Sequence, residues 1–308
     1  MEDNAARLRR IRSLANALTV LSVLVVLVSA LMRLDAAGLG CADWPVCYGQ
    51  LLGREPQALE FGPVRILHRL VASISLVLAG IVVWLCLRPR PVQPAATHAS
   101  LLLLLMLALS VLGIWSSDPR QVAVGFLNIM GGLGLVTFSW RVVLACRRPG
   151  PAVEALHPDL LLRLGLGALS LTVMLGAWLG ASHAALACTS LPGCGGVWWP
   201  AAAGLSALDP FLRQVAAPPA GDAGGVLLHL LHRYLALAVL VLLGTAAVRL
   251  LHDEGGQRQA ARAILGLLVI EVALGVLTVL SGLHLWLVLA HGLCAAALLA
   301  SVATLLRR

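Results

Sequence analysis

The sequence ILHRLVA at residues 66–72 returns, with small changes, as LLHRYLA at residues 230–236. Each copy places a His-Arg pair near the start of a long apolar segment. Ionisable side chains inside a membrane span are costly, so they mark functional sites by default. The repetition therefore predicts a duplicated membrane protein that holds a ligand between its halves.

The composition is that of a polytopic membrane protein. Of the 308 residues, 60% are hydrophobic and 12% are charged, whereas a soluble domain has about 25% charged residues. The mean hydropathy is +0.93. The net charge of +8 comes from Arg, because the sequence contains no Lys. These Arg residues gather in short loops, as the positive-inside rule expects, so no nucleic-acid partner is predicted.

Eight apolar segments are long enough, at about 20 residues each, to cross a bilayer. Continuous apolar runs of this length satisfy their backbone hydrogen bonds in lipid as helices. The predicted fold class is all-α, with eight transmembrane helices near residues 13–33, 66–88, 99–117, 121–146, 159–181, 226–251, 261–281 and 284–307.

Arg-rich segments predict the orientation of these helices. They precede the first predicted helix and follow the second, fourth, sixth and eighth, which places all of them on one side. The positive-inside rule makes that side cytoplasmic, with both termini inside and the protein in a bacterial inner membrane. These residues are Arg7, Arg9, Arg10, Arg12, Arg88, Arg90, Arg141, Arg147, Arg148, Arg249, Arg258, Arg262, Arg307 and Arg308.

The linker RRPGP at residues 147–151 divides the chain into halves of four predicted helices, residues 1–148 and 149–308. The halves repeat by position, since the His-Arg pairs are offset by 164 residues (232 − 68). The architecture is therefore predicted to be two pseudo-repeated four-helix bundles. Binding sites in membrane proteins often lie at the interface of such repeats.

Two cysteine pairs fall on the predicted outer side. Cys41/Cys47 and Cys188/Cys194 have the same spacing of six residues. Disulfides persist in the periplasm, so each pair is predicted to form a disulfide on the periplasmic side, over the mouth of its bundle. Zinc binding by these thiolates is the alternative, although no His lies at zinc-like spacing. His183, which is near in sequence, is expected to be a solvated loop residue.

Three histidines lie in the outer parts of predicted helices: His68 in the second, His232 in the sixth and His291 in the eighth. The sixth and eighth helices are alternate members of an antiparallel four-helix half, so they can face each other. His232 and His291 are therefore predicted as an axial pair for a heme iron. The alternative is that each hydrogen-bonds a neighbouring helix. His229 lies one turn before His232, but the repeated Arg favours His232 as the ligand.

The first half has Asn128 where the second half has His291, at an offset of 163 residues (291 − 128). Asn is a poor iron ligand, so His68 would be the only strong ligand of a first-half pocket with an open opposite face. One closed and one open site is the usual distinction between a resident cofactor and a reacting group. The alternative is that the first half has degenerated.

Other charged residues accompany these candidate ligands. Arg69 and Arg233 keep their charge, so each needs an anion or a route to water. Heme propionates would suit them through bidentate pairing, and snorkelling to the outer interface is the alternative. Glu271 lies mid-helix in the seventh predicted helix and would be neutral or paired if buried.

Three features together resemble the heme A synthase family over nearly the whole chain. They are the stretch GLGCADWPVC at residues 38–47, the two His-Arg helix starts, and Ala290-His291-Gly292. Members of that family oxidise heme O to heme A for cytochrome oxidase by converting a ring methyl to a formyl group. The resemblance therefore implies a heme-dependent oxidoreductase that acts on a CH group, with heme O as its substrate.

The resemblance also implies which half does what. It implies a heme b cofactor held by His232 and His291 in residues 149–308. It implies substrate heme at His68, with the position of Asn128 opposite, in residues 1–148. Heme O synthase and cytochrome oxidase assembly factors are the implied partners, together with membrane lipid.

The sequence departs from this family in the first half. The family has a Glu one turn before the first-half His, where this chain has Arg65, and often a His at the position of Asn128. Two other functions therefore stay open. One is a non-catalytic heme-binding or heme-handover protein, which these departures favour, and the other is a bis-His b-type electron-transfer cytochrome.

Overall fold

The computed structural model describes residues 2–36, 62–115, 121–146, 160–212, 217–252 and 257–305. Within these ranges the fold is almost entirely helical, with eight helices long and apolar enough to span a membrane. The predicted all-α class and the eight spans are confirmed. The helices are α1 (Glu2–Ala36), α2 (Gly62–Leu87), α3 (Ala96–Trp115), α4 (Val122–Ala145), α5 (Leu160–Ala181), α6 (Ala223–His252), α7 (Arg258–Leu280) and α8 (Leu285–Leu305).

The first helix begins at Glu2, well before the apolar segment predicted from residue 13. The reason is that the Arg-rich segment has partners of its own. Arg7 donates from Nε to the carbonyl of Leu85 (2.7 Å) and from the guanidinium to Cys86 (3.2 Å) and Pro91 (3.2 Å). These carbonyls lie at the end of α2, where a helix leaves acceptors unsatisfied. The basic segment therefore continues as helix and closes the end of α2.

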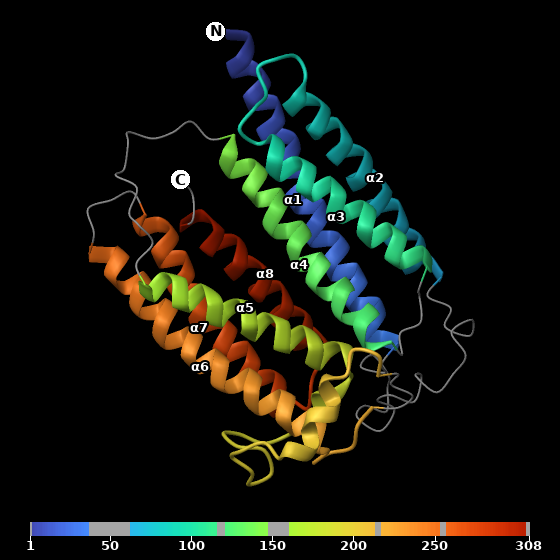
Figure 1. Cartoon of the computed structure of the whole chain (residues 1–308), viewed down its shortest axis with the longest axis vertical. Helices are drawn as coiled ribbons and strands as arrows, with labels where there is room; N and C mark the ends of the chain where they lie inside the picture. The colour runs from blue at the N-terminus through green and yellow to red at the C-terminus, as the bar shows by residue number, and fades with distance from the viewer. Residues whose placement is uncertain are drawn as a thin grey trace.

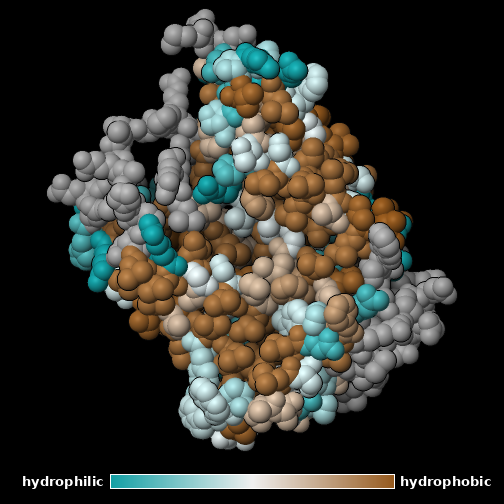
Figure 2. Space-filling model, viewed as in Figure 1, coloured by the Kyte–Doolittle hydropathy of each residue, from teal (hydrophilic) through white to brown (hydrophobic). Residues whose placement is uncertain are grey.

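Apolar side chains cover much of the outside of the molecule (Figure 2). On α2, for example, Ile66, Leu70, Val77 and Trp84 are between 56% and 68% exposed. A soluble monomer rarely exposes so continuous an apolar face. The chain is an integral membrane protein, and these side chains form its lipid-facing surface.

The helices are arranged as two groups of four, α1–α4 and α5–α8 (Figure 1). α4 joins them, because it packs against both α5 and α8. At one end, the Arg141 guanidinium donates to the carbonyl of Ala303 (3.3 Å), which ties α4 to α8. The start of α1 and the end of α8 lie at this same end (Figure 1).

The opposite end carries the loop between Cys188 and Cys194 and is called the disulfide end below. Two short 3-10 helices, η3 (Ala184–Ala187) and η4 (Ala202–Leu208), flank this loop and pack on α6. Trp178 near the end of α5 donates from its indole to the carbonyl of Ala207 (2.8 Å). The long second-half loop is thus folded over the ends of α5 and α6.

Candidate functional site

His232 and His291 lie together in the second group of helices. His232 is nine residues after Ala223, where α6 begins, and His291 is six residues after Leu285, where α8 begins. Both helices start at the disulfide end, so the two rings lie at similar depth. The ring centroids are 6.4 Å apart and the ring planes are 82° apart.

A polar group on a neighbouring helix holds Nδ1 of each ring. Nδ1 of His232 lies 3.0 Å from the carbonyl oxygen of Thr172 on α5. A carbonyl only accepts, so Nδ1 carries the proton and donates it. Nδ1 of His291 lies 3.3 Å from Oε1 of Glu271 on α7. With Nδ1 protonated, Nε2 of His232 keeps its lone pair, which is the arrangement a metal-binding His requires, and a proton on Nδ1 of His291 beside the Glu271 carboxyl group would give the same arrangement.

A glycine of a neighbouring helix lies against each histidine ring. A Cβ at Gly176 on α5 would lie 3.0 Å from Cε1 of His232, and one at Gly275 on α7 would lie 3.4 Å from Cε1 of His291. Each glycine comes four residues, about one turn, after the residue that holds Nδ1, since 172 + 4 = 176 and 271 + 4 = 275. The two rings therefore occupy equivalent niches.

The ring spacing fits one metal bound from opposite sides. With metal–imidazole bonds of about 2.0–2.1 Å and about 1.15 Å from Nε2 to the ring centre, the centroids would be roughly 6.3–6.5 Å apart. The observed separation is 6.4 Å. Bis-His ligation with the ligands on alternate helices of a bundle is a usual way to hold a heme iron. The pair therefore fits the cofactor that the sequence implied.

His229 and Arg233, the neighbours of His232, have other partners. His229 is buried, and its Nε2 lies 2.7 Å from the carbonyl oxygen of Ala185 in η3. Arg233 donates from one guanidinium nitrogen to carbonyls of the disulfide loop, at 2.9 Å for Ser190 and 2.8 Å for Gly193. Its other terminal nitrogen is buried and has no hydrogen-bond partner among the described residues. Arg233 thus ties the loop to α6 while one nitrogen stays available to an anion.

The candidate site residues of the first half are more exposed than those of the second half. His68 lies six residues after Gly62 and is half-buried, and Asn128 lies six residues after Val122 and is also half-buried. Arg65 and Arg69 are exposed on α2. α3 holds the place in its half that α7 holds in the second, yet it contains no acidic residue comparable to Glu271. Of these first-half residues, His68 is thus the one strong ligand.

The structure tests the predictions for one cysteine pair and for His183. Cys188 and Cys194 form a disulfide, whereas Cys41 and Cys47 lie outside the described residues. The prediction that His183 is solvated is wrong, because its side chain is only 4% exposed. It lies directly before η3, within reach of the charge of Arg33 on α1. Burial, and then the positive charge of Arg33, lower the pKa of His183 to about 4.

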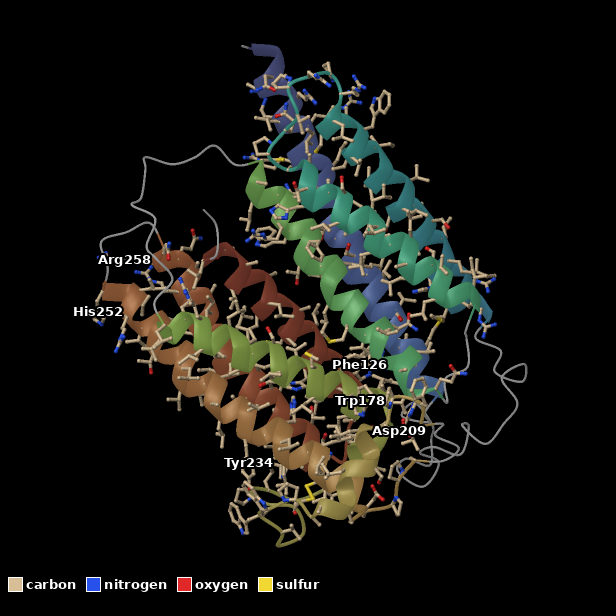
Figure 3. The ribbon with its side chains drawn as sticks, viewed as in Figure 1. Phe126, Trp178, Asp209, Tyr234, His252 and Arg258 are labelled. Carbon is tan, nitrogen blue, oxygen red and sulfur yellow. A yellow bond between two sulfur atoms is a disulfide. The ribbon has the colours of Figure 1, made fainter. Side chains whose placement is uncertain are left out.

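The two groups of helices meet beside these sites. Phe126 on α4 and Trp178 on α5 contact each other edge to face, with ring centroids 5.0 Å apart (Figure 3). Phe126 is two residues before Asn128, and Trp178 is two residues after Gly176. The helix that carries Asn128 therefore packs on the helix that supports His232.

The chain is thus a polytopic helical membrane protein whose second half presents a His pair with heme-ligand spacing. The cytochrome oxidase assembly protein family model matches residues 66–303. The heme A synthase of Shewanella oneidensis is 31% identical over 315 residues, which cover 93% of this chain and 92% of the relative. The heme A synthase of Symbiobacterium thermophilum is 27% identical, over 92% of this chain and 90% of the relative.

The chain belongs to the cytochrome oxidase assembly protein family, and the resemblance to heme A synthases is confirmed. The sequence pattern had not singled out Thr172, Gly176 or Gly275, and it had assigned Glu271 no partner. One signal could have found them. In both α5 and α7 a polar residue nine positions before the helix end is followed four residues later by Gly.

Proposed function

We propose that this protein is an oxidoreductase of the heme A synthase type, which converts a methyl group of heme O to the formyl group of heme A for cytochrome oxidase assembly. The near-complete coverage of the Shewanella heme A synthase supports this function. The single observation that carries it is the His232–His291 pair, whose 6.4 Å separation suits a heme iron. A soluble oxidoreductase fold or a lone intramembrane His would not explain that pair.

In the proposed function the second half holds heme b. Nε2 of His232 and Nε2 of His291 would hold its iron, and the Thr172 carbonyl and Glu271 would orient the two rings. The buried free nitrogen of Arg233 suits a propionate. When bound, the heme supplies the electron-transfer and oxygen chemistry, and the protein supplies orientation and exclusion of water.

In the same proposal the first half binds the substrate. His68 is its ligand, with Asn128 on the opposite face and Arg69 near the propionates. The side chains of Ile66 and Leu70 beside His68 are 68% and 56% exposed on the lipid-facing surface. Heme O carries a long apolar tail, so a ligand that opens to lipid here suits it. Heme O synthase is the proposed source of this substrate within the membrane.

The proposed location is the bacterial inner membrane, with the disulfide end in the periplasm. Arg7, Arg141, Arg249 and Arg258 lie at the end where α1 starts and α8 ends. The positive-inside rule assigns that end to the cytoplasm. The Cys188–Cys194 disulfide then lies on the oxidising side, where such bonds persist.

Heme extraction tests the proposed function. The protein is co-expressed with a heme O synthase and purified, and its hemes are separated by chromatography. Heme A or a hydroxylated intermediate is the expected product. The matched controls His232→Ala and His291→Ala should lose the low-spin absorption and the product together. Heme O that remains wholly unconverted beside a normal heme b spectrum would refute the enzyme function.

One observation favours a second candidate. Arg65 stands where the family has a Glu near the substrate ligand, and the described part of α2 has no acidic residue. A heme-handover protein would bind heme O at His68 without changing it. In the extraction experiment this candidate predicts bound but unconverted heme O, which His68→Ala should release.

A further inference from the structure

Glu271 is an acidic residue inside the bilayer, in the middle of α7. Its side chain is 18% exposed, and it is the only acidic residue between Arg258 and Leu280. A carboxyl group at this depth costs several kcal/mol unless a partner compensates it. Such a residue therefore needs a structural or functional reason.

The partner that the structure gives Glu271 is His291. Oε1 of Glu271 lies 3.3 Å from Nδ1 of His291 as a charge contact without hydrogen-bond geometry, and Oε2 is buried without a hydrogen-bond partner among the described residues. The thiol of Cys294, three residues beyond His291, hydrogen-bonds the side chain of Glu271 and lies 3.6 Å from the carbonyl oxygen of Leu267. The carboxyl group therefore has two neighbours, the Cys294 thiol and Nδ1 of His291.

The equivalent niche around His232 is built differently. There Nδ1 donates to the neutral carbonyl of Thr172, and Gly176 supports the ring as Gly275 supports His291. The two niches thus match in geometry, but only the niche of His291 adds a carboxyl group, with Oε1 of Glu271 3.3 Å from Nδ1. A carboxylate makes a stronger acceptor than an amide carbonyl, and it raises the basicity of the ligating ring.

We propose that Glu271 is a positioning residue that makes the two axial ligands unequal. It holds the ring of His291 from the Nδ1 side, which leaves Nε2 for the iron, and increases the electron donation of that ring. This inference rests on the proposed function, because it requires a heme between His232 and His291. Added electron density and a nearby negative charge stabilise oxidised iron over reduced iron, so Glu271 keeps the midpoint potential low.

The test compares purified wild-type protein with Glu271→Gln, Glu271→Asp and Thr278→Val. Glutamine keeps the shape and an acceptor oxygen but removes the carboxylate, and aspartate keeps the carboxylate on a shorter side chain. Thr278 is a buried polar residue on the same helix, placed after Gly275, and serves as the matched control. Each protein is titrated for its midpoint potential at one pH, and its low-spin EPR spectrum and heme content are recorded.

Glu271→Gln is expected to favour the reduced heme by about tenfold or more, which corresponds to a rise of about 59 mV for one electron. Its EPR spectrum should shift toward a weaker axial donor. Glu271→Asp should give a smaller rise, and Thr278→Val should match the wild type.

The outcomes test two claims separately: the role of Glu271 and the heme site between His232 and His291. If Glu271→Gln keeps its heme with an unchanged potential and EPR spectrum, the role of Glu271 is refuted. If Glu271→Gln cannot hold heme, a raised potential in Glu271→Asp supports the role and an unchanged potential refutes it. A wild-type protein without a six-coordinate low-spin heme refutes the proposed cofactor site itself, whatever the variants do.

Discussion

Replacing Gly176 with Ala is expected to weaken heme binding by displacing the His232 ring. The new Cβ would lie 3.0 Å from Cε1 and 3.3 Å from Nδ1 of that ring, whereas carbon atoms in contact prefer about 3.5–4.0 Å. The ring must therefore retreat by roughly 0.5–1 Å, which also strains the 3.0 Å hydrogen bond from Nδ1 to Thr172. Overpacking of this size costs about 1–3 kcal/mol, which corresponds to about 5- to 140-fold weaker heme binding.

Gly275→Ala is the matched control on the other ring. Its Cβ would lie 3.4 Å from Cε1 and 3.9 Å from Nδ1 of His291, which is close to ordinary contact. The assay is the rate at which each purified protein loses heme to an excess of a heme-free acceptor protein. Gly176→Ala should lose heme much faster than the wild type, and Gly275→Ala nearly as slowly as the wild type. Equal rates for the two variants, or faster loss from Gly275→Ala, would contradict the packing argument.

Three further predictions follow from the same structure. Because the planes of His232 and His291 are 82° apart, the oxidised protein should give the strongly anisotropic low-spin EPR signal of near-perpendicular axial rings; a signal typical of parallel rings would contradict this geometry. His229→Ala should keep the low-spin absorption, since His229 bonds Ala185, but should lower the thermal midpoint through a loss of about 1–3 kcal/mol. The pKa of His183 is lowered to about 4 in the folded protein, from about 6.5 in the unfolded chain. The folded protein therefore favours the neutral ring, which contributes stability above pH 6.5. This contribution, up to about 3 kcal/mol, is lost as the pH falls toward 4. His183→Asn, which tolerates the same left-handed backbone (φ 53°), should flatten that part of the stability–pH curve, and an unchanged curve would assign the acid sensitivity elsewhere.

The eight helices follow from the sequence because lipid leaves a long apolar segment almost no choice except helix. The pairing of His232 with His291 was also predictable. Both lie near the same ends of alternate helices in a four-helix half, and antiparallel packing brings such positions across from each other. The Cys188–Cys194 disulfide was predictable from a spacing of six residues on the predicted outer side.

Hydropathy was less informative where a side chain's own partners decide the structure. Arg7 extends α1 beyond its apolar segment because it finds carbonyls at the end of α2. His183 was expected in water, but its side chain is buried near Arg33 of α1. Arg233 was predicted to bind an anion or snorkel, yet one of its nitrogens holds the disulfide loop. In each case the partner lies on another segment, and its approach depends on how that segment folds.

The immediate surroundings of the His pair depend on packing in the same way. Thr172 acts through its backbone carbonyl, which every residue has, so its side chain takes no part in holding His232. Gly176 and Gly275 matter because α5 and α7 turn those positions toward the rings. Glu271 is visible in the sequence as a costly charge in lipid, but its partner His291 is not. The sequence by itself thus determines the membrane-spanning helices and the candidate ligands. The rotation and crossing of the helices arise from contacts between distant segments, and they determine the environment of each ligand.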